Sequence, residues 1–409
     1  MTVSQQGFVI VGAGMAGAKA AEALRGSGFD GTITVLGDEA HRPYERPPLS
    51  KDLLLGKGER DDIFVHAEDW YREHDVDLQL GTEVTAIDRG GRLVEIAGGG
   101  VRYDKLLLTT GARPRTLDIP GATADGVLYL RQLADSERVK ETLDRVSRLL
   151  VIGSGWIGLE VAAAARQADV AVTVLGTSEL PLLRALGPEL GAIFADLHRS
   201  HDVDLRGGVS VSEITTADGK VTGVRLADGT EIAAEAVLVA VGAEPNTRLA
   251  EQAGLRVDNG IVVDAGLRTD DPNVFAAGDV ASAFHPLLGK HIRVEHWANA
   301  LNQPTVAAAN MLGNQTEYDE LPYFFTDQYD LGMEYHGYVD PGRPHQVIFR
   351  GDVAAREFIA FWLADGKVNA AINVNTWDVG DPIKSLIRST KPIDPAALAD
   401  PNHPLDSFA

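Results

Sequence analysis

Short apolar runs followed at once by a glycine-rich turn and a helix-forming run occur twice along the chain. The first copy reads IVGAGMAGAKAAEAL, residues 10–24, and the second reads VIGSGWIGLEVA, residues 151–162. Apolar runs of this length are typical of buried strands, and the segments that follow them have helical composition. The apolar segments TITVL, ending at Leu36, and AVTVL, ending at Leu175, add a second strand to each copy. The pattern predicts two βαβ units.

The glycines inside these two copies have the same spacing. They are Gly12, Gly14 and Gly17 in the first copy and Gly153, Gly155 and Gly158 in the second. The first glycine permits a tight turn, the second lets the backbone approach a pyrophosphate, and the third lets helix and strand pack closely. The helix N-terminus then faces the phosphates. One such motif alone is often an ordinary glycine-rich turn, but two copies in this context favour two dinucleotide-binding sites.

Two later apolar strands end in similar turns, which suggests a duplicated architecture. They are LLLTTGARP, residues 106–114, and VLVAVGAEPN, residues 237–246, and the second βαβ unit lies between them. After about residue 322 the alternation of apolar and polar residues becomes typical of strands. We therefore predict an α/β fold with two Rossmann-like dinucleotide-binding domains and a smaller α+β C-terminal domain. The predicted boundaries are 1–112 with 246–322, 113–245, and 323–409.

Composition narrows the classes of partner. A chain of 409 residues is long enough for two or three cores. Its formal net charge of -22 argues against broad binding to nucleic acid or to anionic membranes. The chain starts without a basic segment before its first strand, and no apolar run approaches the length of a membrane span. We expect a cytoplasmic protein that binds neither nucleic acid nor membrane.

The chain contains no cysteine. Disulfide reduction by a thiol pair of its own is therefore excluded, as are thiolate-ligated zinc and iron-sulfur centres within the chain. Histidines at 285, 291 and 296 lack convincing metal-ligand spacing, so no metal site is predicted.

Each set of three glycines is called a fingerprint below. An acidic residue about twenty positions past a fingerprint can accept hydrogen bonds from ribose hydroxyls. Asp38 and Glu39 stand there in the first copy, although a solvated pair at a strand end is the alternative. The second copy has Gly176, Thr177 and Ser178, with no acid before Glu179. Without an acid to repel a 2′-phosphate, NADPH is less strongly excluded, but the nearest arginine is Arg184. The second nucleotide is left open between NADH and NADPH.

Three further features suggest contacts with a ring system or sugar chain. Asp279 follows Gly278 at the end of an apolar strand, where a carboxylate can reach the hydroxyls of a ribityl chain or simply cap a helix. Lys51 and Glu160 are opposite charges from the two nucleotide domains that could meet as a buried pair, and a cation near a flavin ring would favour its reduced, anionic form. Trp297 could pack on a ring or fill a core.

The motifs VGAGMAG, RPPLSK, TTGARPR, VIGSGWIGLE, VAVGAEPN, VFAAGDV, VEHWANA and YFFTDQYD follow one another over nearly the full chain. In this combination the chain resembles the FAD-dependent, NAD(P)H-using ferredoxin reductases of the putidaredoxin reductase and aromatic-ring dioxygenase type, which share the glutathione-reductase-type fold. The resemblance implies hydride transfer from a nicotinamide cofactor to FAD. Single electrons would then pass to an iron-sulfur ferredoxin that serves a cytochrome P450 or Rieske-type oxygenase.

The resemblance also implies site residues. FAD contacts fall on Gly12, Gly14, Gly17, Asp38, Arg46, Lys51, Val84, Arg131, Gly278, Asp279, Glu295, His296 and Trp297. Contacts with NADH, or with NADPH, fall on Gly153, Gly155, Ile157, Gly158, Glu160 and Gly242. Glu160 would lie beside the nicotinamide and Lys51 near the flavin, as the two catalytic residues. Gly176 stands where relatives commonly have an acid, and Phe325 where several have a tryptophan.

A strongly acidic reductase can dock an acidic ferredoxin only through a local basic patch. Lys384, Arg388 and Lys391 recur at intervals of four and three and would share one face of a helix, which Arg293 could extend. Ordinary solvated charges are the alternative. The rival functions are an NADH oxidase or quinone reductase of the same fold and a flavin-bound interaction protein of the apoptosis-inducing-factor kind.

Overall fold

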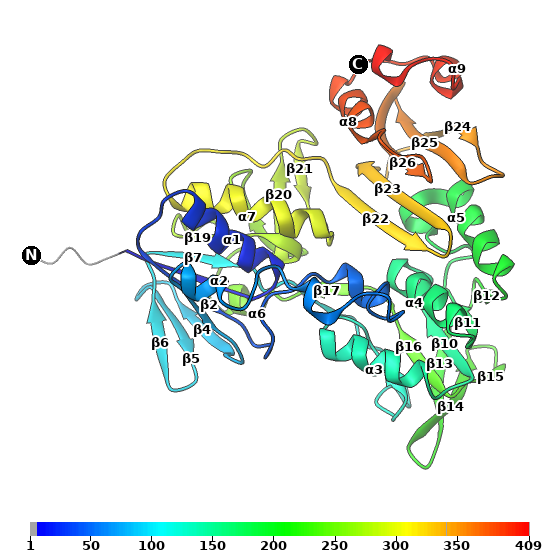
Figure 1. Cartoon of the computed structure of the whole chain (residues 1–409), viewed down its shortest axis with the longest axis horizontal. Helices are drawn as coiled ribbons and strands as arrows, with labels where there is room; N and C mark the ends of the chain where they lie inside the picture. Colours follow the sequence, from blue (N-terminus) through cyan, green and yellow to red (C-terminus); the bar gives the residue numbers. More distant parts are fainter. Residues whose placement is uncertain (1–5, 341, 409) are drawn as a thin grey trace, which may run out of the picture. The chain divides into compact units, whose positions relative to one another are not determined.

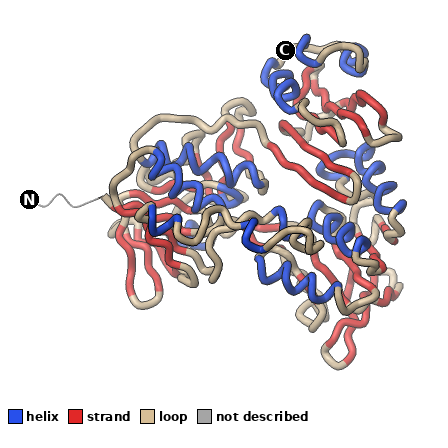
Figure 2. The backbone as a smooth tube through the Cα atoms, in the orientation of Figure 1, coloured by secondary structure: helices blue, strands red, loops and turns tan. Residues whose placement is uncertain are grey.

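The computed structural model describes residues 6–340 and 342–408 (Figure 1). The chain divides into two compact units, each assembled from separate stretches of sequence. The first comprises Met1–Glu45, Arg60–Arg113 and Glu244–Pro322, and the second comprises Arg46–Glu59, Pro114–Ala243 and Tyr323–Ala409. Both units contain helices and strands, as Figure 2 shows. The three-domain division stays a prediction.

A parallel sheet of five strands, in the order β19-β7-β1-β2-β3, forms the centre of the first unit. The strands are β1 (Gly7–Val11), β2 (Thr32–Leu36), β3 (Val76–Gln79), β7 (Lys105–Leu108) and β19 (Val274–Ala276). The central residues of β1, β2, β7 and β19 are buried because both faces of a parallel sheet are covered, while only the first residue of the edge strand β3 is buried. Helices α1 (Met15–Gly26) and α7 (Trp297–Met311) pack against each other over this sheet (Figure 1).

Smaller elements complete the first unit. They are the antiparallel strands β4 (Val84–Asp88), β5 (Leu93–Ile96) and β6 (Gly99–Arg102), the sheet of β18 (Ile261–Val263), β20 (Ala281–His285) and β21 (Lys290–Ile292), and the short helices α2 (Trp70–Glu73), α6 (Arg248–Gln252), η2 (Arg60–Ile63) and η3 (Gly278–Val280). Strands β8 (Ala112–Pro114) and β17 (Ala243–Pro245) lie where the chain passes from one unit to the other.

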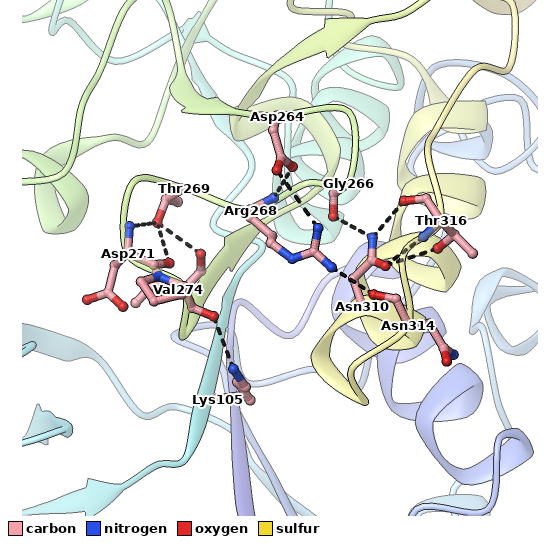
Figure 3. Close-up of polar contacts among 11 residues, drawn as sticks. Lys105, Asp264, Gly266, Arg268, Thr269, Asp271, Val274, Asn310, Asn314 and Thr316 are labelled. Atoms are coloured by element: carbon pink, nitrogen blue, oxygen red, sulfur yellow. Dashed lines mark hydrogen bonds and ion pairs between the residues drawn. The ribbon is translucent and has the colours of Figure 1, made fainter.

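A polar network fixes the end of α7 against the loop that leads into β19 (Figure 3). The buried amide of Asn310 donates to the carbonyl oxygens of Gly266 and Thr316, both at 2.8 Å, and accepts from the Thr316 amide at 2.9 Å. Arg268 donates to the carbonyl of Asn314 at 2.8 Å. The network thus joins the C-terminal end of α7, the end away from Trp297, to the loop before β19.

The second unit contains another parallel sheet of five strands, in the order β12-β11-β10-β16-β9. The strands are β9 (Val127–Leu128), β10 (Arg148–Ile152), β11 (Ala171–Leu175), β12 (Asp204–Arg206) and β16 (Ala236–Val239). The associated elements are η1 (Pro47–Ser50), α3 (Leu133–Leu143), α4 (Trp156–Gln167), α5 (Leu183–Ser200) and the antiparallel strands β13 (Val211–Ala217), β14 (Lys220–Leu226) and β15 (Glu231–Ala233).

An antiparallel sheet in the order β22-β23-β26-β25-β24 forms the C-terminal part of this unit. Its strands are β22 (Tyr323–Gln328), β23 (Leu331–Gly337), β24 (Gln346–Asp352), β25 (Glu357–Ala364) and β26 (Lys367–Val374), followed by α8 (Gly380–Ser389), α9 (Pro395–Ala399) and η4 (Leu405–Phe408). Phe358, Phe361 and Trp362 are buried in it. The predicted α/β class, with two Rossmann-like sheets and an α+β C-terminal part, is confirmed.

Within residues 6–340 and 342–408, no helix is both long and apolar enough to cross a membrane.

Candidate active site

The first fingerprint forms a turn that only glycines fit. Gly12 has φ +118°, and a Cβ atom there would lie 2.2 Å from the carbonyl oxygen of Thr109. A Cβ on Gly17 would lie 2.1 Å from the carbonyl oxygen of Gly12. A Cβ on Gly14, by contrast, would meet nothing within 4 Å. The first and third glycines are therefore needed for packing, while the second opens onto space that a ligand can enter.

The second fingerprint repeats this geometry. Gly153 has φ +114°, and its Cβ would lie 2.2 Å from the carbonyl oxygen of Ala240. A Cβ on Gly158 would lie 2.3 Å from the carbonyl oxygen of Gly153, and one on Gly155 would meet nothing within 4 Å. Gly14 and Gly155 are the N-caps of α1 and α4, and neither helix has a side-chain cap or an acid in its first turn. Both helix N-termini therefore fit the phosphates of a dinucleotide.

The two copies align residue by residue, and this alignment adds Thr177 to the candidates for the second ribose position. The amide of Gly12 donates to Leu36 and the amide of Gly153 to Leu175, both at 2.8 Å. Gly176 thus corresponds to Gly37, and the residue that corresponds to Asp38 is Thr177.

The packing at the two strand ends explains why both copies have glycine there. A Cβ at Gly37 would lie 2.3 Å from Ala13 Cβ, and one at Gly176 would lie 2.5 Å from Ser154 Oγ. Both glycines are buried against the fingerprint turn, whereas Asp38 and Thr177 are exposed. The prediction that Gly176 lies at the ribose position stays a prediction, and Thr177, the counterpart of Asp38, is a second candidate.

In the first unit, the predicted FAD residues that follow β19 lie close to those that begin α7. Asp279 is half-buried in η3, and Gly278, at φ +79°, donates its amide to Gln303 Oε1 at 2.8 Å. Burial lowers the pKa of His296 to about 4, while the charge of Asp279 acts to raise it. Trp297 donates its indole N–H to Glu45 at 3.1 Å. The structure thus brings Asp279, His296 and Trp297 into one region.

The remaining predicted FAD residues of this unit are placed by other elements. Val84 is buried at the start of β4, and Asp38 follows β2. Glu295 is ion-paired with Arg293.

In the second unit, Lys51 and Glu160 form an ion pair. The distance from Lys51 Nζ to Glu160 Oε1 is 2.8 Å, and the side chains are 12% and 6% exposed. Glu160 lies on α4, just after the second fingerprint, and Lys51 follows η1. Residues 46–59 belong to the same compact unit as Glu160, so both charges come from one unit rather than from two.

Two hydroxyls that the sequence reasoning did not single out also reach Glu160. Ser50 donates to Glu160 Oε2 at 2.5 Å, and Thr326 donates to Oε1 at 2.6 Å. Lys51 Nζ lies 5.6 Å from the ring centroid of Phe325. Ser50 lies within RPPLSK and Thr326 within YFFTDQYD, two of the motifs on which the family resemblance rests. The pairing of either hydroxyl with a carboxylate more than a hundred positions away leaves no signal in one sequence.

The other predicted nucleotide contacts of this unit lie on exposed turns or pack on neighbouring segments. Arg46 donates to the carbonyl of Arg131, which joins the loop before η1 to the start of α3. Ile157, in the first turn of α4, is 42% exposed, which is unusual for a large aliphatic side chain beside a fingerprint. Gly242 has φ +107° at the end of β16's turn. Their roles stay predictions.

The predicted docking residues are only partly grouped. Lys384 and Arg388 lie one turn apart on α8. The helix ends at Ser389 because Thr390 is left-handed, with φ 50°, so Lys391 is not on the helix and the predicted shared face of three residues is wrong. Arg293, whose side chain is 9% exposed, lies in the other unit and is paired with Glu295. It presents little free charge, so only Lys384 and Arg388 remain as a pair.

Comparisons with known proteins identify the family. Residues 7–304 match the pyridine nucleotide-disulphide oxidoreductase family, and residues 323–409 match the reductase C-terminal family. The chain is 42% identical to the anthranilate 1,2-dioxygenase system ferredoxin–NAD+ reductase component of Burkholderia cepacia, covering 99% of this chain and 100% of that one. It is 38% identical to putidaredoxin reductase CamA of Pseudomonas putida, covering 97% and 95%.

Solved structures agree. The ferredoxin reductase for the CYP199A2 system from Rhodopseudomonas palustris has a TM-score of 0.95 and 36% identity, covering 99% of this chain and 100% of that one. Putidaredoxin reductase in its covalent complex with putidaredoxin has a TM-score of 0.93 and 37% identity, covering 98% of each. The chain therefore belongs to the pyridine nucleotide-disulphide oxidoreductase family, in the branch of ferredoxin–NAD(P)+ reductases.

Proposed function

We propose that this protein is an FAD-dependent reductase that takes electrons from NADH and passes them singly to an iron-sulfur ferredoxin serving an oxygenase. The proposal rests on two features of one chain. The first is a pair of equivalent glycine cradles, the fingerprint turns around Gly14 and Gly155, and the second is the buried Lys51–Glu160 pair, whose carboxylate follows the second cradle in the sequence. With no cysteine in the chain, the disulphide chemistry in the family's description cannot use its own thiols. An iron-sulfur acceptor fits the relatives, whose names describe reductases of dioxygenase and P450 systems.

The first cradle is assigned to FAD. The amides around Gly14 hold the pyrophosphate, and the half-buried carboxylate of Asp279 accepts hydrogen bonds from the ribityl hydroxyls. When bound, FAD supplies the chemistry that converts a two-electron hydride donor into a one-electron donor. Within the second unit, the Lys51 ammonium is paired with Glu160 and lies 5.6 Å from the centroid of the Phe325 ring, and the family resemblance implies that it would supply positive charge to the flavin.

The second cradle is assigned to the nicotinamide cofactor. The amides around Gly155 hold its pyrophosphate, and Glu160, five residues further along the chain, lies beside the nicotinamide end. The carboxylate is buried and accepts hydrogen bonds from Ser50 and Thr326 as well as from Lys51, so it is held in one orientation. Preorganised groups of this kind contribute to rate by orienting the reacting partners.

Acceptor preference tests the proposal. Purified protein should contain FAD and, with NADH, should reduce a [2Fe–2S] ferredoxin of a bacterial oxygenase system faster than it reduces oxygen or a quinone. Asp279→Ala should lower flavin content. Turnover dominated by oxygen or quinone at equal acceptor concentrations would instead favour the NADH oxidase or quinone reductase alternative.

A further inference from the structure

A line of buried polar side chains ends on the carboxylate of Glu160. His198 on α5, Gln328 and Thr326 on β22, and Glu160 on α4 are all at least 94% buried. The distance from His198 Nε2 to Gln328 Oε1 is 2.8 Å, from Gln328 Nε2 to Thr326 Oγ1 3.1 Å, and from Thr326 Oγ1 to Glu160 Oε1 2.6 Å. All four residues belong to the second compact unit.

The charge on Glu160 decides the direction of every hydrogen bond in this line. An ionised carboxylate paired with Lys51 can only accept, so the Thr326 hydroxyl donates to it. The Thr326 oxygen must then accept from the Gln328 amide N–H, which leaves the Gln328 carbonyl facing His198. His198 is therefore the neutral tautomer with its hydrogen on Nε2, and this agrees with the burial that lowers its pKa to about 4.

We propose that Thr326 and Gln328 are positioning residues for Glu160 and act on the nicotinamide step through it; this inference rests on the proposed function. Three donors meet the carboxylate: Ser50 at the end of η1, the adjacent Lys51, and Thr326 on β22, which is far away in the sequence. Thr326 is itself oriented by Gln328, and Gln328 by His198. Strand β22 therefore makes the C-terminal sheet part of the nicotinamide site.

The burial of these polar side chains argues against a purely structural role for them. Polar groups removed from water cost free energy even when they are paired, and apolar residues of similar volume often replace such groups without loss of stability. Valine at 326 and methionine at 328 would fill nearly the same space. The polar line is therefore best explained by what its end does for Glu160, and this explanation is open to a direct test.

The test is a double-mutant cycle between Thr326→Val and Glu160→Gln, read by anaerobic stopped-flow reduction of the flavin with NADH. Thr326→Val should lower the limiting rate constant about tenfold, because a hydrogen bond to a charged group is lost, while changing the NADH dissociation constant less than about twofold. Thr326→Ser should restore the rate. Gln328→Met should have a smaller effect in the same direction, about threefold, since it acts through Thr326.

Two measurements distinguish a positioning role of Thr326 from a general loss of structure in the variant. In the Glu160→Gln background, Thr326→Val should change the rate less than about twofold, since the residue it positions is already altered. The long-wavelength charge-transfer absorbance of the reduced protein with NAD+ should weaken in Thr326→Val and return in Thr326→Ser. Thr215→Val, which removes a hydroxyl bonded to Thr222 at 3.1 Å in the separate β13–β14 hairpin, is the matched control and should leave both readouts unchanged.

Additive effects of Thr326→Val and Glu160→Gln would overturn the inference, as would failure of Thr326→Ser to restore the rate. If Thr326→Val does not fold, the same cycle with Gln328→Met decides between these outcomes. A wild-type protein that carries no FAD, or whose flavin is not reduced by NADH, would instead overturn the proposed function, and the inference with it.

Discussion

At the scale of single residues, shifting the alignment of the two nucleotide-binding copies by one position changes the role that is assigned to a residue. The resemblance to ferredoxin reductases assigns Gly176 to the second ribose position, whereas the matching hydrogen bonds of Gly12 and Gly153 make Gly176 the counterpart of Gly37 and Thr177 the counterpart of Asp38. The close approach to Ser154 that makes Gly176 a packing residue is visible only in three dimensions.

The Thr177 candidate predicts a change in cosubstrate preference. Thr177→Glu should lower kcat/KM for NADPH relative to NADH about tenfold, because a carboxylate beside the ribose repels a 2′-phosphate and accepts from the hydroxyls of NADH. Steady-state assays with both cosubstrates measure it. Thr222→Glu, at an exposed position of β14, is the charge-matched control. An unchanged ratio in Thr177→Glu would move the ribose site elsewhere.

Asp279 carries the residue-scale prediction for the flavin. Asp279→Ala should leave the protein folded but reduce the FAD retained through purification, because a half-buried acceptor for the ribityl hydroxyls is removed. The ratio of visible to ultraviolet absorbance measures occupancy. Asp264→Ala is the matched control, because Asp264 caps the loop shown in Figure 3 and contacts Arg268 rather than the predicted site. Full flavin occupancy in Asp279→Ala would contradict the assignment.

Among the elements, the parallel strands and the helices after both fingerprints were predictable because their signals are local. Apolar runs before glycines, and helix formers after them, need no knowledge of distant residues. The end of α8 was missed because the left-handed Thr390 has no strong sequence signal, so Lys391 was wrongly placed on the helix. The line from His198 through Gln328 to Thr326 could not be predicted, since it depends on how β22 packs against α4 and α5.

A buried histidine in the C-terminal sheet, His336, predicts how the stability of the protein depends on pH. His336, on β23, is buried, and its pKa is lowered to about 4, mainly by this burial and also by Lys384, while Glu334 and Asp381 act to raise it. Because the unfolded chain binds a proton near pH 6.5 and the folded chain does not, stability is full above pH 6.5 and falls as the pH drops toward 4. The loss is about 1.4 kcal/mol per pH unit for one such group.

His336→Leu should therefore flatten the fall of Tm between pH 6.5 and pH 4.5. Differential scanning calorimetry across this range measures the slope for wild type, His336→Leu, and the exposed control His345→Leu. Equal slopes in wild type and His336→Leu would show that His336 takes up its proton in the folded state.

At the scale of the whole molecule, a net charge of -22 makes docking of an acidic ferredoxin depend on local basic groups. The double variant Lys384→Glu, Arg388→Glu should raise the KM for ferredoxin, more strongly at low salt, and should affect ferricyanide reduction less. Arg145→Glu, Lys220→Glu makes the same change in net charge at exposed positions elsewhere in the second unit. Equal effects of the two double variants would show that overall charge, not the α8 pair, governs docking.

The two glycine cradles and the buried Lys51–Glu160 pair support two successive activities of this chain. It accepts a hydride and then releases single electrons. Anaerobic titration of the purified protein with NADH in the presence of excess oxidised ferredoxin measures both tasks at once. The account predicts that flavin bleaches with NADH alone and that, with ferredoxin present, each NADH oxidised reduces two ferredoxin molecules. Flavin that NADH reduces but that passes no electrons to any [2Fe–2S] ferredoxin tested would contradict it.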